Sequence, residues 1–273
     1  MSARLELLLA HRSGLDGHRP LYRPLTEGLK VDRSAALREA AMARRSDCAG
    51  DIPPDGFSPE YSDLGYLLLG AAIESASGES LGTLIDEQVM PWAGRCPVGA
   101  SHITEDLRRS VAATEEVSWR GGVIQGAVHD ENAWAIGGVG VCGHAGLFGT
   151  ASDVLALGIL LAETTLGEHD DWLTRDELDV LTRPRHGGTL RAGFDGKSER
   201  GSSAGAHFGP RSFGHLGFTG TSLWVDPDAQ LVAVLLTNRV HPRRERAHLR
   251  ETRPMVHDAI VRWADQFSSR STR

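Results

Sequence analysis

Apolar residues recur at helical intervals in several stretches of this chain. In residues 62–78, with the sequence SDLGYLLLGAAIESASG, Tyr66, Leu69 and Ile73 fall three or four positions apart, and Gly78 provides a helix stop. The same periodicity predicts helices over residues 3–14, 34–45, 80–92, 150–165 and 251–267. Ser80 is the expected N-cap of the helix over 80–92, because serine commonly accepts a hydrogen bond from a first-turn N–H.

Strand signals come late in the chain. Residues 212–227 alternate between apolar and polar positions and end at a turn, and residues 229–240 form a continuous β-rich run typical of a buried strand. Residues 121–149 are glycine-dense and too irregular for a helix or a plain strand. This order of elements predicts an α+β fold, with a small antiparallel sheet followed by a closing helix.

The length of the chain is compatible with one large domain. We expect a single domain over residues 1–273, with a mostly helical lobe and site loops in 1–165 and the sheet strands and C-terminal helix in 205–267.

Composition excludes several classes of function. The formal net charge of −7 and the pI near 5.9 give no general attraction to nucleic acid or to an anionic membrane. No stretch reaches the roughly 18 apolar residues that a membrane span needs. The three cysteines have no C-x-x-C spacing, so neither a disulfide framework nor a zinc site is indicated. No signal peptide is evident at the start of the sequence, and the localisation is left open.

Several polar motifs have simple structural explanations when each is taken alone. Ser62 or Asp63 before an apolar run is commonly a helix cap. The two G-x-S-x-G stretches, 78–82 and 201–205, lack the strand that enters and the helix that leaves a nucleophile elbow. Three histidines are candidate metal ligands by residue type but lack the i, i+4 spacing of helical zinc ligands, so ordinary hydrogen bonds are expected and no metal or other cofactor is predicted. These histidines are His129, His144 and His215.

Taken together, three segments in this order carry a resemblance to a known family. They are YSDLGYLLLGAAIE, VHDENAWAIGGVGVCGHAGLFGTASDV and GHLGFTGTSLWVDP with the following LVAVLLTNRVHP. The combination resembles the serine β-lactamase and penicillin-binding-protein-like hydrolases, in the esterase-like branch related to class C β-lactamases. LELLLAHRSGL near the N-terminus is similar to the LLTHTSGL segment of that family. The resemblance implies an antiparallel sheet flanked by helices, with a helical lobe, and covers nearly the whole chain.

The resemblance also assigns site residues. Tyr61 and Asp63 match the Tyr-x-Asn motif, in which the tyrosine phenolate shuttles a proton and the third residue binds substrate. His215 begins the match to the Lys/His-Thr-Gly motif, which continues through Gly217. The resemblance therefore implies Tyr61 and His215 as catalytic, and Asp63, Gly217 and Phe218 as substrate-binding, with the Phe218 N–H as one half of an oxyanion hole. The implied activity of the complete protein is hydrolysis of an ester, amide or peptide through an acyl-enzyme. The implied substrate is a small acyl compound or a peptide, and the oligomeric state is left open.

Two residues depart from the motifs of the family. Asp63 replaces asparagine, which adds an anion and removes two hydrogen-bond donors. Leu216 replaces threonine and removes a hydroxyl. These departures favour an alternative function, a non-catalytic protein that keeps the cleft and recognises a peptide or cell-wall fragment. A decayed gene fragment is the remaining alternative.

The family's Ser-x-x-Lys nucleophile motif is absent from the sequence. Lys30 and Lys197 are the only lysines, and Glu27 and Phe194 stand three residues before them. The family places this motif a few dozen residues ahead of the segment that here begins at Leu5, so we expect the start to fall after the nucleophile helix and the first strands. Without a neighbouring ammonium, the pKa of the tyrosine in the Tyr-x-Asn match should stay near about 10, and we expect this chain alone to be inactive.

Overall fold

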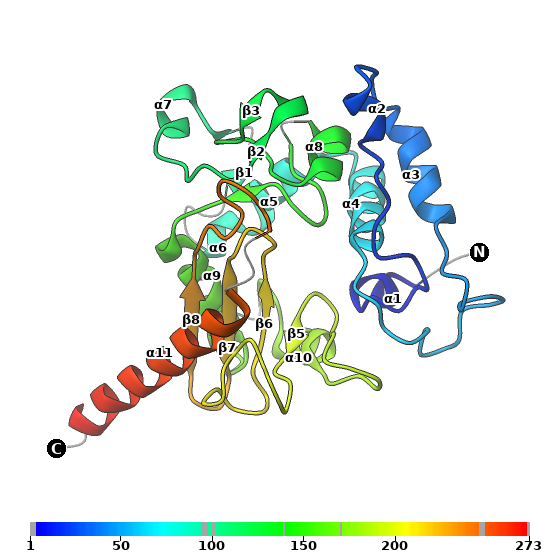
Figure 1. Cartoon of the computed structure of the whole chain (residues 1–273). Helices are drawn as coiled ribbons and strands as arrows, with labels where there is room; N and C mark the ends of the chain where they lie inside the picture. The colour runs from blue at the N-terminus through cyan, green and yellow to red at the C-terminus, as the bar shows by residue number, and fades with distance from the viewer. Residues whose placement is uncertain are drawn as a thin grey trace.

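The computed structural model of the chain describes residues 4–93, 98–99, 102–138, 140–169, 171–245 and 249–271. Helices from the first 77 residues lie together on one side, and a four-stranded sheet with its flanking helices lies on the other (Figure 1). The helices of the first group are α1 (Leu5–Leu9), α2 (Arg23–Thr26), α3 (Arg33–Met42) and α4 (Asp63–Ser77). This arrangement of helices and antiparallel sheet confirms the predicted α+β class.

Helix α4 is the centre of the helical group, and its two ends are fixed as the sequence predicts. The Ser62 hydroxyl accepts a hydrogen bond from the Gly65 N–H, and Gly78 ends the helix with a left-handed backbone at φ 78°. Its apolar face packs against α3 and the helix α8 (Glu131–Gly137). The buried residues of this core are Leu21, Ala36, Ala40, Ala43, Leu64, Leu67 and Ile136.

The sheet is antiparallel, with its strands in the order β5–β6–β7–β8. Its strands are β5 (Asp195–Gly196), β6 (Phe213–Leu216), β7 (Ser222–Asp226) and β8 (Leu231–Leu235). Side chains alternate between the two faces, so Val225 packs towards α9 (Ala151–Thr164) and α10 (Arg175–Thr182), whereas Trp224 packs towards α11 (Leu249–Ser271). Helices α9 and α11 thus cover opposite faces of the sheet (Figure 1).

Short elements connect the two groups. They are α5 (Leu81–Gln88), α6 (Met90–Ala93), α7 (Glu105–Arg108), the 3-10 helix η2 (Ser118–Arg120), and the strand pairs β1 (Val98–Gly99) with β4 (Leu147–Phe148) and β2 (Glu116–Val117) with β3 (Gly122–Val123). Within the described part of the chain, the helices are too short or too polar to cross a lipid bilayer.

Some predicted elements differ from the observed ones. The first helix ends at Leu9, before the positive φ of 58° at His11, and the helix predicted over 80–92 divides into α5 and α6. The predicted strand over 212–227 is a hairpin of two strands, β6 and β7, because the segment 217–221 turns the chain. The strand predicted to be buried, β8, lies at an edge of the described sheet, with only Ala233 among its five residues buried.

The glycine-rich segment after α8 touches the backbone of α4 at Gly143. A Cβ atom at this position would lie 1.9 Å from the Tyr66 carbonyl oxygen, and a backbone oxygen inside a helix has little freedom to move. We expect Gly143→Ala to lower the free energy of unfolding by about 1–3 kcal/mol, the usual cost of overpacking.

Urea unfolding of the two proteins measures this effect. Gly82→Ala in α5 is the matched control, because its Cβ would meet only the Ser80 hydroxyl at 3.7 Å. In a helix this second change should stabilise by about 0.5–1 kcal/mol. Equal stability of Gly143→Ala and the wild type would contradict the close approach.

Candidate functional site

Tyr61 lies immediately before the first turn of α4, at the place where the helical group meets the sheet. Its ring centroid is 4.5 Å from that of His11 and 6.0 Å from that of His215 on β6. The two residues that the resemblance implies as catalytic are therefore brought together from segments more than 150 positions apart. The Ser62 side chain between Tyr61 and Asp63 is buried and caps α4.

His11 packs against the ring of Tyr61 and was not among the predicted site residues. Its ring packs against Tyr61 and, at 5.1 Å, against Tyr66, and its Nδ1 accepts a 2.9 Å hydrogen bond from the Ser62 N–H. Only 4% of the residue is exposed. Burial, with a smaller effect of the nearby His215, lowers the pKa of His11 to about 4, so the imidazole is neutral at pH 7. His11 belongs to the LELLLAHRSGL segment, and the similarity of this segment to LLTHTSGL was the signal for the residue.

The phenol of Tyr61 is protonated at neutral pH. Although 47% of the residue is exposed, its partial burial and the charges of Asp63 and Asp130 raise its pKa to about 12. This value is higher than the ordinary one expected from the sequence. Tyr61 can therefore act as a base only if a cation is placed beside its oxygen.

Asp63 occupies the first turn of α4, and the charge of its carboxylate acts on the Tyr61 phenol. Its N–H donates to the Gly17 carbonyl, and the nearest ion-pair partner is the exposed His18, whose Nδ1 is 3.9 Å from a carboxylate oxygen. Burial raises the pKa of Asp63, against the lowering influence of His144. An acceptor-only group thus stands where an asparagine would offer donors.

One ring nitrogen of His215 is hydrogen-bonded to the backbone of its neighbour. Its Nδ1–H donates to the Leu216 carbonyl at 2.9 Å, which fixes the tautomer and leaves Nε2 as an acceptor. No partner for Nε2 is found among the residues that the structure describes. In this form His215 can accept a proton or, once protonated, donate to an anion.

Phe218 follows β6 and forms a separate aromatic platform. Its ring is 56% exposed, stacks on His129 at 5.8 Å and lies under the Arg239 guanidinium at 4.3 Å. The Gly217 N–H is occupied by the Thr221 carbonyl, whereas the Phe218 N–H has no hydrogen-bond acceptor within the described ranges. A free N–H at the end of β6 is what an oxyanion hole needs.

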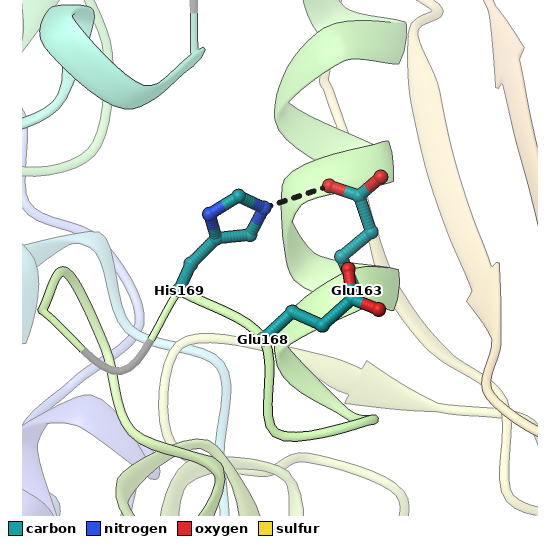
Figure 2. A group of neighbouring side chains, drawn as sticks. All are labelled: Glu163, Glu168 and His169. Atoms are coloured by element: carbon teal, nitrogen blue, oxygen red, sulfur yellow. Dashed lines mark hydrogen bonds and ion pairs between the residues drawn. The ribbon is translucent and has the colours of Figure 1, made fainter.

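The three histidines considered from the sequence have other partners. His129 Nε2 lies 3.2 Å from Glu115, His144 Nε2 lies 2.8 Å from Asp130, and His215 bonds its own neighbour's carbonyl. In the described residues, the three side chains that bring possible ligand atoms within 4.8 Å of one another are Glu163, Glu168 and His169, near the C-terminal end of α9 (Figure 2). This group is partly exposed, and its His169–Glu163 contact of 3.0 Å is an ordinary hydrogen bond.

A cavity of about 400 Å³ opens in the helical group, away from Tyr61. It is lined by residues of α3, α4, α5 and α8 and of the glycine-rich segment after α8, and its wall includes Cys142. None of Tyr61, Asp63 and His215 lines it. The candidate site is therefore distinct from this cavity.

Comparison with known proteins identifies the fold and the family. The family described as Beta-lactamase matches residues 2–254. An N-acetylmuramyl-L-alanine amidase of Bacillus subtilis (strain 168) is 28% identical over 257 residues, covering 86% of this chain and 55% of that protein. A putative D-alanyl-D-alanine carboxypeptidase of Escherichia coli (strain K12) is 31% identical over 200 residues, covering 66% of this chain and 45% of that protein.

A solved structure agrees with this assignment. The crystal structure of a beta-lactamase from Mycobacterium bovis superposes with a TM-score of 0.56 at 20% identity, covering 95% of this chain and 73% of that one. The chain spans about half the length of the curated relatives it matches. The sequence match and the shared fold together show that this chain belongs to the Beta-lactamase family of hydrolases.

Proposed function

We propose that Tyr61 and His215 are half of an acyl-transfer site that hydrolyses an amide or peptide bond through an acyl-enzyme. The observation that carries the proposal is the approach of their rings to 6.0 Å, with Asp63 on the same segment as Tyr61. The names of the relatives, an amidase and a putative carboxypeptidase, favour an amide or peptide over an ester.

The nucleophile would have to come from outside these 273 residues, because they contain no Ser-x-x-Lys. In the proposed reaction, the serine oxygen attacks the carbonyl carbon while its proton passes to the Tyr61 phenolate, and the leaving amine then takes that proton. The lysine ammonium lowers the pKa of Tyr61, which is otherwise about 12. The Phe218 N–H would stabilise the oxyanion.

Covalent labelling tests this division of roles. The recombinant 273-residue chain and the protein isolated from its source cells are each incubated with a fluorescent penicillin and with a fluorophosphonate. We expect an adduct on the native protein and none on the recombinant chain. If neither reagent forms an adduct on the native protein, the proposed function is overturned.

A non-catalytic binding function is the second candidate, and Asp63 and Leu216 favour it. The Leu216 side chain is apolar and packs, partly buried, against the core beside α11. It therefore offers no hydrogen-bonding group to a substrate. A native protein that forms no adduct but gains thermal stability with a cell-wall peptide would support this candidate.

A further inference from the structure

The turn between β6 and β7 carries the candidate oxyanion N–H and lies beside the end of β8. Across the three strands, Leu216 is paired with Ser222, and Ser222 is paired with Leu235. Because the sheet is antiparallel, β6 and β8 end at the same edge, and the residues that follow each strand are neighbours. The turn formed by residues 217–221 therefore lies against residues 237–239.

The direction of the Phe218 N–H depends on the shape of this turn. The carbonyl group of the same peptide unit belongs to Gly217, and it accepts a 3.0 Å hydrogen bond from the Gly220 N–H inside the turn. In a trans peptide the N–H points away from the carbonyl oxygen, so the Phe218 N–H is directed out of the turn. The candidate oxyanion donor keeps this direction only while the turn keeps its shape.

The segment after β8 holds three consecutive carbonyl groups of the turn. The Arg239 Nε–H donates to the Phe218 carbonyl at 2.5 Å, and the Arg239 backbone N–H donates to the Thr219 carbonyl at 2.9 Å. The Thr237 hydroxyl donates to the Gly220 carbonyl at 2.6 Å. A Cβ atom at Gly220 would clash with the Thr237 hydroxyl oxygen, so the two segments are in direct contact.

The Arg239 side chain is free to serve the turn because it is not used in an ion pair. Arg244, which lies over the same aromatic ring, contacts the carboxylates of Glu115 and Glu131. Within the described ranges, no carboxylate lies at ion-pair distance from Arg239, and its guanidinium lies 4.3 Å from the centroid of the Phe218 ring. One side chain therefore restrains both the carbonyl group and the ring of Phe218.

We propose that Arg239 is a positioning residue of the candidate oxyanion hole. By binding the Phe218 carbonyl and covering the Phe218 ring, it keeps the turn in the shape that directs the Phe218 N–H outward. The carbonyl oxygen of the substrate gains negative charge when the serine attacks, and a donor already held in place stabilises this charge without reorganisation. The inference rests on the proposed acyl-transfer function and deepens it.

Amide hydrogen exchange in the native protein tests the effect on the turn without requiring activity. Exchange of the hydrogen-bonded Gly217 and Gly220 amides is followed by mass spectrometry of fragments that cover residues 217–221. Arg239→Met removes the Nε–H donor but keeps an unbranched side chain, and we expect it to accelerate this exchange about tenfold. Thr237→Val, the second variant, removes the hydroxyl donor at nearly constant volume and should accelerate the exchange about fivefold. Exchange at the wild-type rate in Arg239→Met would overturn the proposal.

Arg211→Met is the matched control, because it removes an arginine at the opposite end of the same β-hairpin. Arg211 precedes β6, and its Nε lies 3.0 Å from both carboxylate oxygens of Asp228, which follows β7. We expect Arg211→Met to leave exchange in the turn and the acylation rate unchanged. A loss in this control equal to that in Arg239→Met would show that the turn has no particular dependence on Arg239, and would contradict the proposal.

The role in the site is tested by the acylation of the native protein at a series of concentrations of the fluorescent penicillin. This series separates the acylation rate constant from the dissociation constant of the non-covalent complex. We expect Arg239→Met to lower the acylation rate constant by about 10–100-fold, which is less than the loss of a whole oxyanion donor. The dissociation constant should stay unchanged, because the oxyanion forms only during reaction. Thr237→Val, which removes no charge, should lower the same rate constant by about fivefold.

Two results of the acylation series would overturn the proposal. A raised dissociation constant with an unchanged acylation rate constant in Arg239→Met would show that Arg239 binds substrate directly. Acylation of Thr237→Val at the wild-type rate would show that the charge of Arg239, and not the shape of the turn, is what matters. A native protein that forms no adduct with either reagent overturns the proposed function, while hydrogen exchange still decides whether Arg239 holds the turn.

Discussion

Replacing Tyr61 by phenylalanine in the native protein is expected to lower the rate of acylation by about 10²–10⁴-fold, the usual contribution of a positioned general base. The change removes the phenol oxygen and keeps the ring, which packs on His11 at 4.5 Å and faces His215 at 6.0 Å. Reversible binding should therefore change little, and the loss should appear in the chemical step. Stopped-flow or gel-based labelling with the fluorescent penicillin measures the acylation rate directly.

Tyr22→Phe provides the control for this prediction. Tyr22 stacks on Trp119 at 5.6 Å, outside the candidate site, so the variant removes a phenol oxygen with no expected effect on acylation. Acylation of Tyr61→Phe at the wild-type rate would show that Tyr61 transfers no proton, and the proposed chemistry would fail.

Acid is expected to destabilise the chain through His11, by about 3 kcal/mol between pH 6.5 and 4. Because the pKa of His11 falls to about 4 in the folded chain, the unfolded chain binds a proton first as the pH falls below 6.5. The free energy of unfolding therefore decreases through this window and levels off below about pH 4. The cause is the burial of the ring between Tyr61 and Tyr66, where a charged imidazole would be desolvated.

Urea unfolding of the wild type and of His11→Asn at a series of pH values measures this contribution. Asparagine tolerates the positive φ of 58° at this position and does not titrate. His129 and His257 are also buried with lowered pKa values. The contribution of His11 is therefore the difference in the free energy of unfolding between the wild type and the variant at each pH. A difference that does not change between pH 6.5 and 4 would contradict the burial of a neutral His11.

Local sequence signals predicted helix α4, which begins at Asp63 and directly follows the Tyr61 segment. Helix α4 has a serine N-cap, an apolar face and a glycine stop, all of which act within a few residues, and its observed ends match them. Helix α8 was missed, because it lies in a glycine-dense segment and is only seven residues long. Its N-cap, Asp130, is recognisable as such only once the Ala133 N–H is seen to reach it.

The contacts among the site residues could not be predicted from the sequence. His11, Tyr61 and His215 meet across more than 200 positions, where the segment before α4 lies against strand β6. The match to short family motifs identified Tyr61 and His215. The raised pKa of Tyr61, however, depends on burial and on Asp130 from another segment.

Peptide mapping of the covalent adduct on the native protein tests whether Tyr61 and His215 belong to an acyl-transfer site. The protein from its source cells is labelled with a fluorophosphonate, digested and examined by mass spectrometry. We expect one modified serine, in a Ser-x-x-Lys sequence outside the 273 residues, on a polypeptide that also contains Tyr61 and His215. A label on a serine within the 273 residues, such as Ser80 or Ser203, would contradict the assignment of Tyr61 and His215 to the acyl-transfer site.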